Sequence, residues 1–313
     1  MMILTLLPLP ARHSSLVTAL KHIGYKAMNS INTQTQLYGV IGHPIAHSHS
    51  PAMLNAAFFA TGINSVYLAF DVTDLPSAIA GIRALNIRGI AVTIPHKVTV
   101  MDLLDEIDDT ASRIGAVNTI TNNNGKLTGT NTDAHGAITA LEEHTGNLKG
   151  ADIVILGAGG AARAVAHGAA QKGATIHILN RTASKGEALA AEINATFHPL
   201  SQLHKTPQTI PYDILINTTS VGMHPDFNDS PIPPEALLPG TYIMDIIYNP
   251  LKTRLLHDAE TRNCKTIDGL SMFVHQGARQ FTLWTGQSPP TQQMRNTVHQ
   301  QLTNPSHNHT ASQ

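Results

Sequence analysis

The fold is decided by the stretch Asp152-Ile-Val-Ile-Leu-Gly157-Ala-Gly159-Gly160-Ala-Ala162-Arg-Ala. Its apolar run, 153–156, is typical of a buried strand and ends at Gly157; small apolar residues then recur at helical spacing as far as Gly173. A second apolar run, 174–179, follows. Strand, glycine turn, helix and strand in this order form the setting that a dinucleotide-binding fingerprint requires. There, Gly157 permits the tight turn, Gly159 lets backbone N–H groups approach a pyrophosphate, and Ala162 keeps the helix close to the sheet.

The end of the second strand indicates which dinucleotide binds. NAD sites place Asp or Glu about twenty residues past the glycines, where it accepts hydrogen bonds from the ribose 2′-hydroxyl. This chain has Asn180-Arg181-Thr182 at that position. A guanidinium with amide and hydroxyl donors suits a 2′-phosphate and offers no carboxylate to repel it. The alternative is an ordinary glycine-rich turn with a surface arginine, but the flanking strands and helix favour a cofactor site. We therefore expect NADP.

The amino-acid composition limits the classes of protein to which this chain can belong. The 313 residues, with a net charge of −1, are enough for two domains that each have their own core. Near-neutral charge argues against a nucleic-acid partner or a membrane surface. The 18 histidines show no metal-ligand spacing, so we expect no metal. One cysteine, Cys264, excludes an internal disulfide and fits a reducing compartment, which favours a cytoplasmic location.

The two ends of the chain fall outside this pattern. Residues 1–35 include an apolar stretch, 3–9, that lacks a preceding positive charge. We expect a flexible extension or translation that begins at Met28, with a secretory signal as the alternative. The polar tail 304–313 is expected to be disordered. No apolar run approaches the roughly 20 residues of a membrane span.

The first half of the chain is rich in hydroxyl groups after a predicted strand, 37–41. The loop that follows ends in Ser48-His-Ser50-Pro51, and a helix is expected over 51–61. Ser50 is a candidate N-cap, which leaves Ser48 unexplained. Paired hydroxyls beside a positive helix end also suit a carboxylate, so both interpretations stay open.

Later segments of this half bring a lysine and an aspartate. A predicted strand, 89–94, places Thr93 and Lys97 at its carboxyl end, where ligands bind in parallel sheets. Lys97 is either a solvated surface group or a proton-transfer group. A predicted hairpin with its turn at 122–125 is followed by Asp133, and Asn118 is expected within the apolar strand that leads into this turn. Asp133 either caps the next helix or holds the Lys97 ammonium.

Taken together, these segments resemble the shikimate dehydrogenase family, in order and over nearly the whole chain from Leu37 to about Leu302. Nine motifs carry the resemblance: Gly42-His-Pro-Ile-Ala-His-Ser48-His-Ser50-Pro51-Ala-Met-Leu-Asn55, Val92-Thr93-Ile-Pro-His-Lys97, Ala116-Val-Asn118-Thr, Asn131-Thr-Asp133, Gly157-Ala-Gly-Gly-Ala161, Asn180-Arg181-Thr182, Asn217-Thr-Thr-Ser220-Val-Gly-Met223, Asp245-Ile-Ile-Tyr248-Asn-Pro and Asp268-Gly269-Leu-Ser-Met272-Phe-Val-His-Gln276. Any one of them is weak evidence, but nine in register are specific.

The resemblance implies an NADPH-dependent reduction of the C3 ketone of 3-dehydroshikimate to shikimate, on the route to chorismate and the aromatic amino acids. Lys97, paired with Asp133, would be catalytic, and Ser48 and Ser50 would bind the substrate carboxylate. The ring hydroxyls would be held by Thr93, Asn118, Asp133 and Gln276, with Tyr248 nearby. The cofactor would be lined by Gly157, Ala158, Gly159, Gly160, Ala161, Asn180, Arg181, Thr182, Thr218, Ile246 and Gly269.

One position departs from the family pattern. Similar proteins usually carry Asn where this chain has Ala91. The loss of one hydrogen bond is worth about 0.5–1.5 kcal/mol net, so we expect a changed affinity rather than lost activity. The change also leaves room for a different or looser substrate.

The expected architecture is α/β with two domains and a cleft between them. An N-terminal α/β substrate domain, 36–133, is completed by 269–303, and a Rossmann-type NADP-binding domain takes 134–268. A helix over 270–284 brings Gln276 to the substrate side, while its apolar residues Leu270, Phe273, Val274 and Phe281 are assigned to the core. We expect a monomer or homodimer. Two alternatives are a quinate/shikimate dehydrogenase that uses NAD and a non-catalytic NADP-binding regulator of the same fold.

Overall fold

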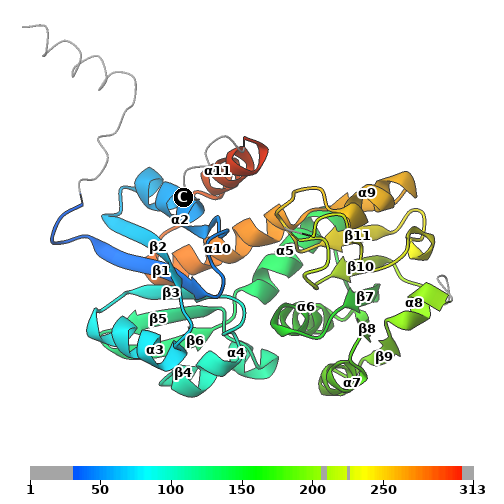
Figure 1. The fold of residues 1–313 in the computed structure, drawn as a ribbon, viewed down its shortest axis with the longest axis horizontal. Helices are drawn as coiled ribbons and strands as arrows, with labels where there is room; N and C mark the ends of the chain where they lie inside the picture. Colours follow the sequence, from blue (N-terminus) through cyan, green and yellow to red (C-terminus); the bar gives the residue numbers. More distant parts are fainter. Residues whose placement is uncertain (1–30, 206–209, 224–225, 305–313) are drawn as a thin grey trace, which may run out of the picture.

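Two mixed α/β layers, each built on its own sheet, make up the computed structural model, which describes residues 31–205, 210–223 and 226–304 (Figure 1). Most of the predicted N-terminal extension and of the predicted C-terminal tail lies outside the described residues. The two sheets lie at opposite ends of the molecule, with helices α5 and α10 running between them.

The first sheet is formed by the N-terminal part of the chain. Its strands, in spatial order, are β2 (Ser65–Asp71), β1 (Gln36–Gly42), β3 (Gly89–Val92), β5 (Thr119–Asn123), β6 (Lys126–Thr130) and β4 (Glu106–Ile107). β1 pairs in parallel with β2 and β3, whereas β5 and β6 form the predicted antiparallel hairpin. Asn124 and Gly125 both have positive φ in its two-residue turn, as a tight hairpin turn demands.

Helices from both ends of the chain cover this sheet. The N-terminal ones are α2 (Ser50–Thr61), α3 (Leu75–Ala84), the 3₁₀ turn η1 (Thr99–Leu103) and α4 (Asp109–Ile114). The C-terminal helices α10 (Gly269–Thr285) and α11 (Thr291–Thr303) return to the same core. There, Leu270, Val274 and Phe281 of α10 and Met294 and Val298 of α11 pack with Val40 of β1 and Met53 of α2. The predicted core role of the apolar residues of α10 is confirmed, with Phe273 partly buried at the edge.

The second sheet is entirely parallel. Its strands, in spatial order, are β9 (Thr196–Pro199), β8 (Thr175–Asn180), β7 (Asp152–Leu156), β10 (Ile214–Asn217), β11 (Tyr242–Asp245) and β12 (Lys265–Ile267). Its helices are α6 (Gly160–Gln171), α7 (Ala183–Glu192), α8 (Ser201–Lys205), η2 (Pro234–Ala236) and α9 (Arg254–Thr261). This order is that of a doubly wound dinucleotide-binding fold, whose topological switch point lies between β7 and β10. The predicted Rossmann-type architecture is therefore confirmed.

Helix α5 (Asp133–Thr145) links the two halves and packs along α10. The two helices lie close because Gly136 has no side chain: a Cβ there would lie 2.7 Å from the carbonyl oxygen of Met272. A small apolar cluster joins the halves further, with Ala164 of α6 against Ile114, Ala116 and Ala134. The glycine loop (residues 157–161) of the second half thus faces the loops of the first half that carry Lys97 and Ala116.

The structure corrects three local predictions. β3 ends at Val92 instead of residue 94, because the Thr93 carbonyl accepts the His96 N–H in a turn. Helix α2 begins at Ser50 with His49 at its N-cap, so Ser50 is not the N-cap. Asn118 lies just before β5 and not within a strand.

None of the helices that the structure describes is long and apolar enough to cross a bilayer. Within the same residues, no three or more His, Cys, Asp and Glu side chains form a group able to hold a metal ion.

Candidate active site

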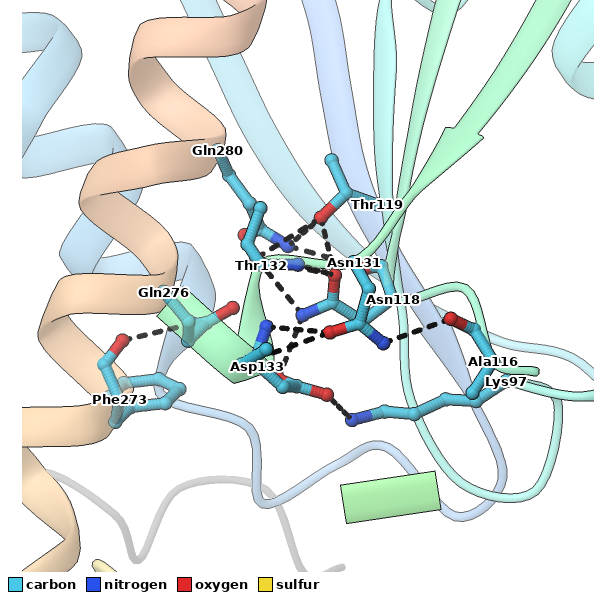
Figure 2. Close-up of polar contacts among 11 residues, drawn as sticks. Lys97, Ala116, Asn118, Thr119, Asn131, Thr132, Asp133, Phe273, Gln276 and Gln280 are labelled. Atoms are coloured by element: carbon cyan, nitrogen blue, oxygen red, sulfur yellow. Dashed lines mark hydrogen bonds and ion pairs between the residues drawn. The ribbon is translucent and has the colours of Figure 1, made fainter. Parts of the chain in front are cut away.

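Lys97 and Asp133 form an ion pair at the centre of the site (Figure 2). Lys97 lies in the loop after β3, and Asp133 is the first residue of α5. Lys97 Nζ is 2.5 Å from Asp133 Oδ2, and the two side chains are 17% and 7% exposed. The N-cap of α5 is Thr132, so Asp133 is not a capping residue; its carboxylate is committed to the lysine.

Asn118 holds the other oxygen of this carboxylate. Its Nδ2 donates to Asp133 Oδ1 over 2.7 Å, while its Oδ1 accepts the Thr132 N–H at 2.7 Å and the Thr119 hydroxyl at 2.7 Å. Its buried amide is thus satisfied on both sides, as buried polar groups require. The network fixes the Asp133 carboxylate, which in turn fixes the Lys97 ammonium.

Asn131 is a residue of this network that sequence reasoning quoted within a motif without assigning a role. Its Oδ1 accepts the N–H groups of Asp133 and Ala134, at 3.0 and 3.3 Å, and its Nδ2 donates to the carbonyl of Ala116. It therefore performs the capping role that had been considered for Asp133. The signal was its position two residues before the helix.

Helix α10 carries two glutamines on the side of this network, and Gln280 bonds to it. Gln276 is half-buried, and its amide donates to the Phe273 carbonyl at 2.9 Å. Gln280, one turn further on, is buried and donates to the Thr119 hydroxyl at 2.9 Å. Figure 2 shows both approaching from the helix side, opposite Lys97. Gln280 was missed by sequence reasoning, although its spacing of four from Gln276 places both on one helix face.

Ser48 and Ser50 lie at the start of α2, at the end of the segment 43–50, here called the serine loop. Ser48 is half-buried and its Oγ accepts the backbone N–H of the buried Ser50 at 3.3 Å. His49 at the N-cap makes no side-chain hydrogen bond to the helix, the Ser50 amide is bonded to Ser48 Oγ, and Pro51 has no N–H, so the two hydroxyl groups are the main polar groups at this helix start. Thr93 is half-buried directly after β3.

Ala91 faces the apolar core of the first half. It pairs with Val40 of β1 and Thr119 of β5 and is buried among the residues packed under α2 and α10. The position that usually carries Asn in similar proteins is thus occupied here by a small core residue next to the polar network.

Tyr248 extends from the loop after β11 toward the serines. Its ring stacks on Phe273, with ring centroids 4.1 Å apart, and lies edge-on to His49 at 6.0 Å. Burial raises the pKa of Tyr248 to about 12, and a hydrogen bond from the backbone of His49 offsets only part of that rise. Tyr248 is therefore a neutral phenol near pH 7.

The glycine loop has the geometry that a pyrophosphate needs. Gly157 has φ +114°, and a Cβ there would lie 2.7 Å from Thr218 Oγ1. Gly159 is the N-cap of α6, which has no capping side chain, and a Cβ on it would meet no atom within 4 Å. The first amides of α6 therefore open into free space, as an anion site requires. A Cβ on Gly160 would lie 3.6 Å from Lys97 Cδ, so the loop, completed by Ala158 and Ala161, adjoins the ion pair.

The other predicted cofactor residues surround the same end of the second sheet. Arg181 is exposed directly after β8, between Asn180, whose amide donates to the Thr182 carbonyl, and Thr182 at the N-cap of α7. The Thr218 hydroxyl donates to Leu156 at 2.6 Å and so joins the ends of β10 and β7. Ile246 lies beside Gly269, where a Cβ would be 2.4 Å from the Ile246 carbonyl oxygen. The residues present thus fit a dinucleotide with a 2′-phosphate.

Solved structures with this fold carry more than one activity. A shikimate dehydrogenase in complex with NADP⁺ has a TM-score of 0.82 at 47% identity, covering 87% of this chain and 97% of its own. The shikimate 5-dehydrogenase of Thermus thermophilus in complex with NADP(H) and shikimate has a TM-score of 0.78 at 37% identity, covering 85% and 99%. A 5-ketofructose reductase of Gluconobacter sp. and an NAD complex of quinate dehydrogenase from Corynebacterium glutamicum have TM-scores of 0.76 and 0.78, at 38% and 31% identity. The two matches cover 86% and 85% of this chain, respectively, and 99% of the reductase chain and of the quinate dehydrogenase chain.

Family models and a curated relative point to the same family along most of the chain. A model of the shikimate dehydrogenase substrate binding domain matches residues 40–120, one of shikimate/quinate 5-dehydrogenase matches 139–225, and one of the shikimate 5′-dehydrogenase C-terminal domain matches 269–299. The shikimate dehydrogenase (NADP(+)) of Methanocaldococcus jannaschii is 48% identical over 281 residues, which is 87% of this chain and 99% of that protein. With the ion pair, the serine loop and the glycine loop each in place, the chain belongs to the shikimate dehydrogenase family.

Proposed function

We propose that this chain catalyses the reversible, NADPH-dependent reduction of 3-dehydroshikimate to shikimate. The observation that carries the proposal is the Lys97–Asp133 pair, held in a buried amide and hydroxyl network directly beside the glycine loop. Reduction of a ketone to an alcohol adds one hydride and one proton. The pair supplies a proton donor at the place where the two halves of the chain meet.

NADPH, when bound, supplies the hydride to C3 of the substrate. Lys97, as an ammonium, donates its proton to the C3 oxygen as negative charge develops there, and in the reverse direction its free amine accepts that proton. Asp133 keeps the ammonium oriented, and Asn118 keeps Asp133 oriented. The proton transfer therefore needs no reorganisation of the surrounding side chains.

Different residues would bind the carboxylate and the ring hydroxyls of the substrate. Ser48 and Ser50, at the start of α2, would bind the carboxylate with two hydroxyls and the positive helix end. Thr93, Asn118, Asp133 and Gln276 would hold the ring hydroxyls. Tyr248, a neutral phenol, would lie beside the carboxylate end.

Cofactor binding would use the open start of α6 and the end of β8. The amides after Gly159 would hold the pyrophosphate, and Arg181 with Asn180 and Thr182 would hold the 2′-phosphate. The absence of a carboxylate from the segment 180–182 favours NADP over NAD.

The test is NADP⁺ or NAD⁺ reduction by the purified chain, followed at the nicotinamide absorbance, with shikimate and quinate as substrates in all four combinations. We expect strong turnover with shikimate and NADP⁺ alone. Comparable turnover with quinate or NAD⁺ would favour the quinate/shikimate alternative. NADP⁺ binding without turnover in any combination would favour the non-catalytic alternative, and 5-ketofructose with NADPH is then the next substrate, because a solved neighbour carries that activity.

A further inference from the structure

Helix α11 makes a polar contact with the serine loop. Gln301, in the last turn of α11, places its Oε1 2.8 Å from Nδ1 of His49. His49 is only 8% exposed and lies between Ser48 and Ser50. Since an amide oxygen can only accept, Nδ1 of His49 carries the proton of this bond. Two residues 252 positions apart in the chain are thus joined directly at the substrate carboxylate site.

His49 also connects the serine loop to the other half of the chain. A hydrogen bond from its backbone reaches the Tyr248 hydroxyl, and its ring lies edge-on to the Tyr248 ring. Tyr248 in turn stacks on Phe273 of α10. The orientation of His49 therefore affects both its neighbouring serines and the Tyr248 side chain.

Helices α11 and α2, which bring Gln301 and His49 together, pack in one apolar core. Met294 and Val298 of α11 are fully buried in the core beneath α2, so the last turn of α11 is held against the start of α2. His49 itself has φ −89° and ψ 0°, a bridge conformation between the loop and the helix. A ring fixed from α11 restrains the backbone at the point from which both serines project.

We propose that Gln301 is a positioning residue for substrate binding, acting through the imidazole of His49 to hold Ser48 and Ser50 in their carboxylate-binding arrangement. The inference rests on the proposed function of the serine pair. It requires that loss of the Gln301 amide weakens shikimate binding, because the serines then sample other orientations. NADP⁺ binding and the chemical step, which depend on the glycine loop and Lys97, are left unchanged.

The experiment compares Gln301→Leu with Gln300→Leu, a control on the same turn whose side chain is exposed. For Gln301→Leu we expect the KM for shikimate to rise about threefold to tenfold, the range for one lost hydrogen bond. The kcat and the KM for NADP⁺ should stay within about twofold of the unmodified chain, and Gln300→Leu should change none of the three. Partial unfolding of the variant would instead lower the apparent kcat and leave both KM values unchanged.

A double-mutant cycle tests the route through His49. His49→Ala keeps the backbone N–H that bonds to Tyr248 and removes only the ring. If Gln301 acts through that ring, His49→Ala with Gln301→Leu should show a KM no higher than that of the more affected single variant. An unchanged KM in Gln301→Leu, an equal rise in Gln300→Leu, or fully additive effects in the cycle would each overturn the inference. If the unmodified chain turns over no shikimate, the proposed function itself falls and the inference falls with it.

Discussion

At the scale of single residues, the chemistry depends on one ammonium whose orientation is set by its neighbours. Asp133 accepts from Lys97 on one oxygen and from Asn118 on the other. We predict that Lys97→Ala lowers kcat by about 10²- to 10⁴-fold, the usual contribution of a general acid. The KM for shikimate should change little, because the serines and hydroxyl-binding groups remain. Steady-state kinetics with shikimate and NADP⁺ measures both.

The matched control for this prediction is Lys149→Ala, which removes an exposed lysine before β7. Its kcat should equal that of the unmodified chain. NADP⁺ binding and thermal unfolding of Lys97→Ala must be checked alongside, since the variant leaves the Asp133 carboxylate without its cation. A folded Lys97→Ala variant with near-normal kcat would refute the role of Lys97.

Arg181 governs the choice of cofactor. It is exposed after β8, with no carboxylate in the segment 180–182. A lost charge-assisted hydrogen bond is worth about 1.5–3 kcal/mol, so Arg181→Ala should raise the KM for NADP⁺ about 10- to 100-fold. The KM for NAD⁺, which has no 2′-phosphate, should stay nearly constant. An equal rise in KM for NADP⁺ and NAD⁺ would show that Arg181 does not bind the 2′-phosphate.

At the scale of elements, hydrophobic periodicity predicted most of what the structure contains. β7, α6 and β8 and the β5–β6 hairpin lie where the apolar runs and glycines placed them. The ends of elements were harder to predict: β3 stops at Val92, where the Thr93 carbonyl accepts the His96 N–H in a turn. The apolar pattern of 89–94 continues past this point, so hydrophobic periodicity alone could not place the end of the strand.

The glycine loop allows a prediction with an internal control, because glycine is required at positions 157 and 159 for different physical reasons. Gly157 has φ +114° and no room for a Cβ, so Gly157→Ala should lower the free energy of unfolding by about 1–3 kcal/mol. Gly159 has an ordinary φ of −86° and open space around it. Gly159→Ala should therefore fold with a loss of no more than about 1 kcal/mol, yet bind NADP⁺ at least tenfold more weakly, because the methyl group occupies the space for the pyrophosphate.

Urea unfolding and NADP⁺ titration of both variants provide the measurement. The two should separate: Gly157→Ala is defective in stability, whereas Gly159→Ala is defective in cofactor affinity alone. If Gly159→Ala bound NADP⁺ normally, the open space beside it would not be where the pyrophosphate lies.

At the scale of the whole molecule, the site is assembled from segments that only the fold brings together. Gln280 of α10 reaches Thr119 across 161 positions, and Gly160 of the glycine loop meets Lys97 of the other half. The sequence motifs contained many of these residues, and the rule that ligands bind at the carboxyl ends of parallel strands predicted that Thr93 and Lys97 lie at the site. Which side chain bonds to which could not be predicted, because those contacts depend on how α5 and α10 dock the two halves.

Folding stability should also depend on pH through one buried carboxyl. Asp245 is fully buried at the end of β11 and accepts from Asn217 Nδ2, the Ile247 N–H and the Thr253 hydroxyl. Burial raises the pKa of Asp245 to about 6 from its ordinary value of 3.8, and these hydrogen bonds offset only part of the rise. Between these two pH values the native chain keeps a proton that the unfolded chain has released. The stability from this group is thus fully present below about pH 4 and is lost as pH rises through 6.

The change amounts to roughly 3 kcal/mol, since one pKa unit corresponds to about 1.4 kcal/mol. Asp245→Asn cannot titrate, whereas all other carboxyls titrate alike in both proteins, so their effects cancel in the comparison. The variant will be less stable at acid pH, where the protonated carboxyl can both donate and accept in this network. Measured by urea unfolding, its free energy of unfolding relative to that of the unmodified chain should rise by about 2 kcal/mol between pH 4.5 and pH 7. Parallel curves for the two proteins over that range would mean that Asp245 is already ionised in the folded chain at pH 4.5, with its three donors compensating fully for its burial.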